Sequence, residues 1–215
     1  MSPFTKAAIL SCVLLSPATA TAQVTLGVRA GLALPLGDLE DGTPAKERLD
    51  FAYPIEGAIG WRLSPSLEVG VQGGYAFTSV GGDWSKECAV SGRECRAHLW
   101  NLAARGEYAV KAGDFLPFVA ATLGWEWEVE RWEVSADDWE QTRRNGWLGG
   151  LEAGAYAPVT KTLELGAYVG ASFGQLRSAT VKGEIAGYAY TDSGAIPSPA
   201  VHGWLSIGLR GRFTL

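Results

Sequence analysis

Histidine and serine are the first side chains to consider for chemistry in this chain, which holds two histidines. His202 and Ser206 lie four residues apart, so both would point to the same face of an extended strand. A serine becomes a nucleophile when a histidine within hydrogen-bond reach takes its proton. Four residues of strand span about 13 Å at ~3.3 Å per residue, which is too far for that contact. His98 lies beside a predicted loop, so we predict no catalytic residue; an enzyme that acts on lipid is the alternative from another functional class.

Cysteine chemistry is confined to one short stretch beyond the N-terminus. Cys88 and Cys95 lie seven residues apart in the polar segment from Gly81 to Arg96. Such a pair is typical of an oxidising compartment, and we predict a disulfide between them. We expect no metal site, because the spacing does not match metal-ligand motifs and His98 is the nearest imidazole in the sequence.

An acidic stretch runs from residue 128 to residue 140 and also holds two tryptophans. Its acidic residues are Glu128, Glu130, Glu133, Asp137, Asp138 and Glu140. A cation or a sugar could bind there, but the spacing matches no calcium loop. We favour a solvated acidic loop that extends the strands on either side. Gly-x-Gly fragments elsewhere are not followed by Gly-Lys-Ser/Thr, so no phosphate loop and no cofactor are predicted.

The N-terminus has the order of a secretory signal peptide. Lys6 precedes the apolar stretch from Ala7 to Leu15, and small residues follow up to Ala22. We predict cleavage after Ala22, which divides the chain into a signal peptide, 1–22, and one domain, 23–215. Cys12 lies inside the apolar stretch, which disfavours a lipoprotein. The formal net charge of −5 gives no support to nucleic-acid binding.

The elements that must position these residues are strands, because apolar residues recur at every second position. From Val24 to Leu34 the even positions are all aliphatic, whereas the odd ones are small, polar or charged. Eight strands are predicted, at 24–34, 51–63, 67–80, 98–110, 115–127, 147–156, 163–173 and 201–215. Short turns at 64–66, 111–114 and 157–162 alternate with long loops at 35–50, 81–96, 128–146 and 174–200, the last with a weak hairpin pattern. The predicted fold class is all-β, an eight-stranded antiparallel up-and-down barrel.

Charged residues in these strands gather on one face. The inward set predicted by parity is Arg29, Glu56, Arg62, Glu68, Arg105, Glu107, Glu126, Glu152, Glu164, Arg210 and Arg212. Almost no charge falls on the opposite face, as expected for a surface in lipid, where a mid-bilayer Arg or Lys costs roughly 2–4 kcal/mol. A soluble lipocalin-like binding barrel would need the reverse orientation, which parity alone does not exclude.

Aromatic residues on the apolar face occupy two heights. Near the short turns and the C-terminus are Trp61, Tyr108, Phe115 and Phe213. Near the long loops are Phe51, Tyr53, Tyr75, Phe77, Trp100, Trp125, Trp127, Trp147 and Phe173. Aromatic rings prefer both interfaces of a membrane, so this sorting favours a transmembrane barrel over a soluble core.

With these features the chain resembles the small outer-membrane barrels of the OmpA and OmpX type. The segment Gly208 to Leu215 is similar to the family's C-terminal assembly signal, with an aromatic at Phe213 but Leu215 at the end. The resemblance implies a monomer in the outer membrane of a Gram-negative bacterium. It also implies that the partners are outer-membrane lipid, the barrel-assembly machinery and, through the long loops, an extracellular partner.

The interior of such a barrel decides between a plug and a pore. Eight strands leave room for little more than side chains, so five Arg among six Glu predict an interleaved salt-bridge plug. If the turn at 64–66 closes its hairpin symmetrically, Arg62 faces Glu68, and we expect these two side chains to be in contact. The alternatives are charged walls around water, or a small porin.

Overall fold

A computed structural model describes residues 23–40 and 42–215, so the predicted signal peptide lies outside the described residues. Most of the described chain forms one antiparallel sheet. Its strands are β1 (Gln23–Glu40), β2 (Thr43–Pro44), β3 (Leu49–Arg62), β4 (Leu67–Val80), β5 (Glu94–Ala109), β6 (Leu116–Ser135), β7 (Asp138–Pro158), β8 (Leu163–Ile185), β9 (Tyr188–Ala195) and β10 (His202–Thr214). The two helices are α2 (Ala45–Arg48) and α3 (Gly82–Ser91).

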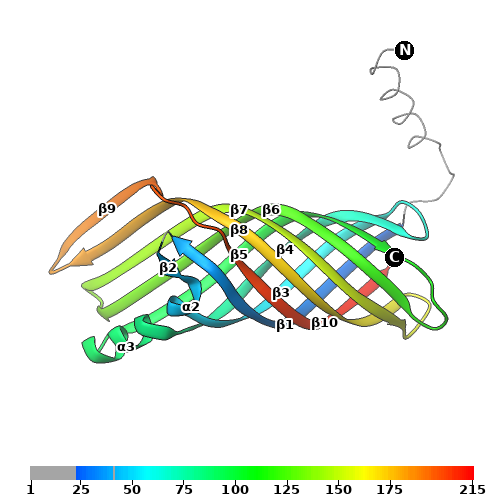
Figure 1. The fold of residues 1–215 in the computed structure, drawn as a ribbon, viewed down its shortest axis with the longest axis horizontal. Coiled ribbons are helices and arrows are strands. Elements are labelled where there is room, and N and C mark those ends of the chain that lie inside the picture. Colours follow the sequence, from blue (N-terminus) through cyan, green and yellow to red (C-terminus); the bar gives the residue numbers. More distant parts are fainter. Residues whose placement is uncertain (1–22, 41) are drawn as a thin grey trace, which may run out of the picture.

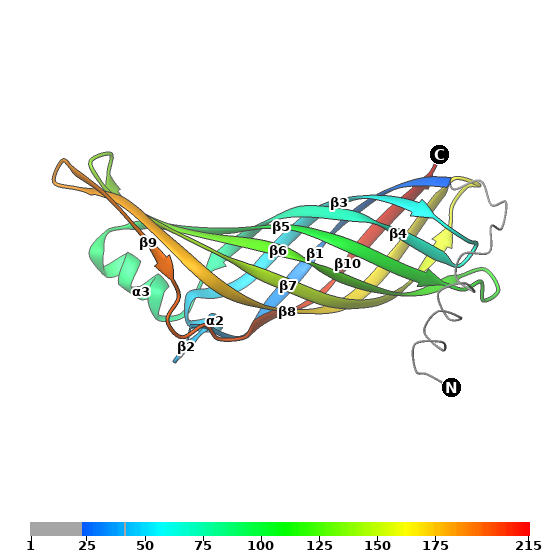
Figure 2. The same ribbon diagram turned by 90° about the horizontal axis from the view of Figure 1, so that it is seen from above.

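The ribbon closes into a barrel (Figures 1 and 2), and eight of these strands form its wall. Neighbours in sequence pair in the order β1, β3, β4, β5, β6, β7, β8 and β10, and β10 returns to β1. Following the pairings once around the wall from Gly27 of β1 leads back to β1 at Gly37, a displacement of ten residues. For eight strands this displacement corresponds to a tilt of about 40° from the barrel axis.

The strands agree with the sequence-based prediction within two residues at their short-turn ends, and most of them exceed it at their long-loop ends. β4 has the predicted bounds, whereas β6 continues to Ser135, β7 begins at Asp138 and β8 continues to Ile185. The predicted hairpin in 174–200 is present as β8 and β9, joined through Ala186 and Gly187, both with positive φ. The predicted loop at 128–146 is wrong, because 16 of its 19 residues are also strand residues paired across β6 and β7.

The outer wall is apolar and the inner wall is charged. Outward side chains in the middle of the strands are exposed, among them Val28 (59%), Leu123 (67%) and Ile207 (59%), whereas Arg105 and Arg210 are each only 6% exposed. This orientation contradicts the lipocalin-like alternative, in which apolar side chains would line a cup. An exposed apolar surface that encircles a barrel is stable where its solvent is lipid.

The long-loop end is covered by the segment between β1 and β3. In Figure 2, α2 and β2 lie close to this end of the barrel, and α3 lies farther out beside the strands that project beyond it. An apolar cluster of Leu39, Ala45, Leu176 and Ile196 holds the covering segment to β8 and to the chain after β9. No helix in the described part of the chain is long and apolar enough to cross a bilayer.

Beyond the barrel, β6, β7, β8 and β9 project as an extended sheet (Figure 1). Among the described residues, β9 pairs with β8 alone, so its other edge is open. Next to this sheet, the predicted disulfide joins Cys88 in α3 to Cys95 in β5. The disulfide therefore ties the outer helix to the sheet.

Candidate functional site in the barrel interior

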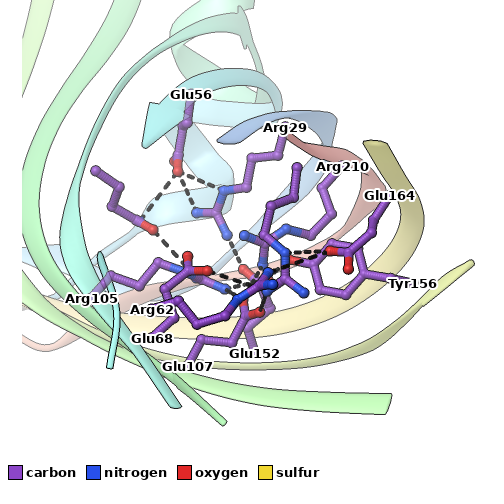
Figure 3. A network of polar contacts seen from close by, with 12 residues as sticks. Arg29, Glu56, Arg62, Glu68, Arg105, Glu107, Glu152, Tyr156, Glu164 and Arg210 are labelled. Carbon is purple, nitrogen blue, oxygen red and sulfur yellow. Dashed lines mark hydrogen bonds and ion pairs between the residues drawn. The ribbon is translucent and has the colours of Figure 1, made fainter. Parts of the chain in front are cut away.

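Glu107 of β5 lies at the centre of a network of ion pairs that crosses the lumen (Figure 3). Its Oε2 lies 2.6 Å from Arg105 Nη2 and 3.2 Å from Arg210 Nη1, and its Oε1 lies 2.5 Å from Arg212 Nη1. The hydroxyl of Tyr156 also donates a hydrogen bond to Oε2, at 3.2 Å. A carboxylate that is 2% exposed is thus surrounded by three guanidinium groups.

Toward the long-loop end, the network continues through Arg29 and Glu152. Arg29 Nε donates to Glu56 Oε2 at 2.6 Å, and the same guanidinium contacts Glu152. Glu152 Oε1 in turn lies 2.6 Å from Arg210 Nη1 and 3.4 Å from Arg105 Nη2. Because β1, β5, β7 and β10 each contribute a residue, these contacts connect opposite parts of the wall.

Toward the short-turn end, Arg212 connects two further carboxylates. Its Nε lies 2.5 Å from Glu164 Oε2, and its Nη1 lies 3.4 Å from Glu68 Oε2. Arg62 is opposite Glu68 in the β3–β4 register, as expected. The expected direct contact is wrong, however: the ion pair of Arg62 is with Glu164 at 3.9 Å, because these long side chains reach across the lumen rather than along the ladder.

Aromatic rings complete the packing around the arginines. The Arg212 guanidinium lies 4.2 Å from the centroid of the Tyr156 ring, and that of Arg210 lies 4.9 Å from the centroid of Phe118. Arg29 lies over Tyr168, at 5.2 Å. Guanidinium planes interact favourably with aromatic faces, more so when desolvated. Phe118, Tyr156 and Tyr168 also belong to one buried apolar cluster, so the network is packed against apolar side chains.

The network is electrically balanced. It joins five arginines to five glutamates, namely Arg29, Arg62, Arg105, Arg210, Arg212, Glu56, Glu68, Glu107, Glu152 and Glu164. Two voids beside it have volumes of about 10 Å³ each, near the lower limit for a single water molecule. Ten of the eleven residues predicted from parity are therefore brought together in one connected network.

Glu126, the eleventh residue, lies in the interior but outside this network. Its Oε1 is 2.6 Å from His202 Nε2, and both side chains are almost inaccessible to solvent. Ser206, which the sequence places on the same face as His202, donates instead to the carbonyl oxygen of Gly170 at 3.3 Å. The histidine is thus engaged with a carboxylate, and the serine with the backbone of β8.

A chamber of about 90 Å³ lies between the ion-pair network and the Glu126–His202 pair. Its lining includes Arg29, Glu56, Asn101, Glu126 and Trp204. Asn101 donates its amide to Glu56 at 3.1 Å, while its own Oδ1 is buried without a hydrogen-bond partner. A chamber of this size, lined by both polar and apolar side chains, has room for several water molecules.

A second charged cluster, which the sequence analysis missed, lies above the chamber. Arg144 Nη1 is 2.8 Å from Glu130 and 3.5 Å from Glu128, and its Nε is 3.0 Å from Glu40. Arg48 of α2 also contacts Glu130, at 3.2 Å. Glu128 and Glu130 are buried, so the expectation that they are solvated is wrong. The parity that places Glu126 inward also places Glu128 there and, continued along β6, would have found Glu130.

The described residues contain no group of three or more His, Cys, Asp or Glu side chains placed to hold a metal ion. The charges of the interior are instead satisfied mainly by one another. An apolar exterior, a tilted eight-stranded wall and a charged interior define the fold of an outer-membrane β-barrel.

Comparison with solved structures agrees with this fold. The chain is similar to a major outer membrane protein from Thermus thermophilus, with a TM-score of 0.61 and 14% identity, over 88% of this chain and 99% of that one. It is also similar to Neisserial surface protein A, with a TM-score of 0.50 and 14% identity, over 88% and 95% of the two chains. No protein-family model matches the sequence, and comparison with curated proteins gives no significant match.

Proposed function

We propose that this protein is an integral outer-membrane barrel whose interior is closed by the balanced ion-pair network and whose role lies at the cell surface. The observation that carries the proposal is the network itself, ten charged side chains that cross the lumen in the half of the barrel nearest the short turns. Water and ions need a continuous path, and the voids of about 10 Å³ beside the network do not provide one. A small porin is the competing function.

The energetics of the network favour a permanent closure. Breaking a buried ion pair leaves an uncompensated charge and costs about 3–5 kcal/mol. A pore through this layer would require several of these contacts to open together. The network therefore resists the fluctuations that would admit ions.

Conductance in planar bilayers tests the closure. Refolded wild-type protein should show no stable large conductance. Replacing Arg105 and Glu107 together with serine removes two large side chains without changing the net charge, and should produce a measurable conductance. The matched control replaces the exposed pair Arg96 and Glu94, which are 2.5 Å apart outside the lumen, and should stay silent. A large open state in the wild type would establish a porin instead.

The surface role falls to the projecting sheet. Ile196 N–H donates to the Arg177 carbonyl at 2.9 Å, so the antiparallel alternation turns the N–H groups of Thr191 and Ser193 away from β8. The N–H of Ser193 donates to Asp192 Oδ1 at 2.8 Å, and the N–H of Thr191 faces outward from this edge. An open edge of this kind accepts an extended peptide as an added strand. This edge carries no Lys, Arg or Pro that would discourage pairing.

A displayed library of random linear peptides tests the open edge. Peptides selected on the wild-type protein should lose binding to Thr191→Pro, which removes an outward N–H but leaves the bonds to β8. Thr191→Val, which keeps that N–H, should bind them as before. Equal binding to the proline variant would place the interaction elsewhere.

The remaining parts of the proposal concern assembly and location. We propose that residues 1–22 direct export, that β10 with Phe213 is recognised by the barrel-assembly machinery of a Gram-negative bacterium, and that the barrel functions as a monomer in outer-membrane lipid. Support comes from the closed wall, which leaves no barrel strand unpaired. The refolded protein should partition into detergent rather than buffer. Size-exclusion chromatography with light scattering should show a single chain.

A further inference from the structure

Three basic side chains on the outside of β7 and β8 have no acidic partner among the described ion pairs. They are Arg143 of β7 and Arg177 and Lys182 of β8, and all three are exposed. Arg143 points away from the lumen, because its neighbour Arg144 points into it. Thr180 lies opposite Arg143, and Lys182 is two residues farther along the same face of β8.

Arg177 joins these two at an irregularity in the ladder. Asn145 pairs with Ser178 and Gly146 with Leu176, so Arg177 is the extra residue between them. Its side-chain contact is a hydrogen bond from Nη2 to Gln175 Oε1, at 3.2 Å. The three residues thus form a local basic patch, which we call the β7–β8 patch.

The β7–β8 patch begins where the outer aromatic band ends. On the outward face of β7, Arg143 is followed by Asn145 and Trp147; Asn145 accepts a hydrogen bond from Trp125 Nε1 at 3.3 Å, and Trp147 packs on Phe173 at 6.1 Å. Four residues of a strand tilted by about 40° rise about 10 Å along the barrel axis. Aromatic residues mark the membrane interface, so Arg143 lies beside the lipid headgroups, and Lys182, opposite Gln141, lies two residues farther out.

Acidic groups nearby do not neutralise the patch. Glu133 is engaged with Arg131 at 3.0 Å, and Glu184 lies nearer the tip, opposite Trp139. Guanidinium and ammonium groups that face a headgroup layer bind phosphate oxygens, in the case of arginine with two parallel hydrogen bonds.

We propose that the β7–β8 patch binds the phosphate groups of a phosphorylated glycolipid in the outer leaflet. The inference rests on the proposed membrane location. Charge complementarity and continuity with the aromatic band select lipid as the occupant over a soluble anion.

Lipid binding by the full chain in detergent micelles tests the proposal, with bisphosphorylated lipid A and its dephosphorylated form as paired probes. One basic residue near an anionic surface is worth about fivefold in affinity, so three predict a preference on the order of a hundredfold for the phosphorylated lipid. The variant R143Q/R177Q/K182Q should lose this preference. The matched control K86Q/K111Q/K161Q removes three basic residues elsewhere and should keep it.

Further arms separate the sources of phosphate. Inorganic phosphate at millimolar concentration should neither bind measurably nor compete, and competition would mean that the patch takes a free anion. Equal binding of both lipids by the wild type, or an undiminished preference in R143Q/R177Q/K182Q, would overturn the proposal. Detergent partition of every variant is measured in parallel. If a variant loses the lipid preference but still partitions into detergent, the loss is assigned to the patch. If the wild type fails to partition into detergent, the proposed membrane location itself is contradicted.

Discussion

Glu126 of β6 and His202 of β10 meet inside the barrel with 2.6 Å between Oε1 and Nε2, although β7 and β8 separate their strands around the wall. Neither side chain has another ion-pair partner among the described residues. Glu126 also lines the chamber, and the contact engages the histidine that lies four residues from Ser206 in the sequence.

The Glu126–His202 contact should be strongly coupled. We expect His202→Gln alone and Glu126→Gln alone each to lower the free energy of unfolding, because each leaves a buried polar partner without its charge complement. The double variant should lose less than the sum, with a coupling of about 0.5–3 kcal/mol measured by urea unfolding in micelles. Additive losses would show that the two groups do not stabilise each other.

Glu107→Gln should be among the most destabilising single substitutions in the protein. The carboxylate faces Arg105, Arg210 and Arg212, so its neutralisation leaves three buried guanidinium groups with less compensation, at a cost of about 3–5 kcal/mol. Tryptophan fluorescence during urea unfolding measures the change. Glu94→Gln, which removes an exposed partner of Arg96, is the matched control and should be indistinguishable from wild type; a similar loss in both variants would contradict the central place of Glu107.

Removing the disulfide should loosen the outer helix without opening the barrel. The loop between Cys88 and Cys95 is short, and its closure is worth about 2.5 kcal/mol by the chain-entropy estimate. The double variant Cys88→Ser/Cys95→Ser should therefore exchange its α3 amide hydrogens faster, while barrel strands such as β4 exchange at the wild-type rate. Faster exchange throughout the wall would mean that the disulfide supports the whole fold.

The projecting hairpin should respond to alkaline pH through Tyr190. Its hydroxyl donates to Glu140 Oε2 at 2.5 Å, and this hydrogen bond raises the pKa of Tyr190 to about 12 from its ordinary value near 10. Because the folded pKa is raised, the contribution of this contact is complete below about pH 10 and is lost as the pH rises toward 12.

Ultraviolet difference titration of wild type against Tyr190→Phe isolates this phenol. Glu140→Gln should lower its midpoint toward 10, whereas Glu133→Gln, on the opposite face of the same hairpin, should not. An unchanged midpoint in Glu140→Gln would contradict the assigned cause.

The two-residue period was sufficient to predict the barrel and the inward side of Arg29, Glu107 and Arg210, because each strand has one face toward lipid and one toward the lumen. It did not predict which charges meet. Arg62 and Glu68 are opposite in register, but arginine side chains are long enough to choose partners across an interior this narrow. That choice depends on the displacement of ten residues around the wall, which no single hairpin contains.

The strand ends beyond the membrane were missed for a different reason. In 128–146 the alternation involves Glu, Trp, Arg and Thr rather than aliphatic residues, so it does not resemble a lipid-facing strand. The side chains of Glu128 and Arg144 nevertheless form an ion pair on the inner face of β6 and β7. A search for charged residues at every second position, without regard to hydrophobicity, would have extended the predicted strands to the full length of β6 and β7.

The seam between β1 and β10 pairs Thr25 with Thr214 and Gly37 with His202, which lie at opposite ends of the described chain. Contacts of such long sequence separation form slowly, since most of the chain must be gathered before the seam yields any stabilisation. The ribosome therefore synthesises β10, the strand that closes the barrel, last. A nonsense mutation before His202 would remove β10 and leave an open sheet with two exposed edges instead of a smaller barrel, a substrate for proteolysis.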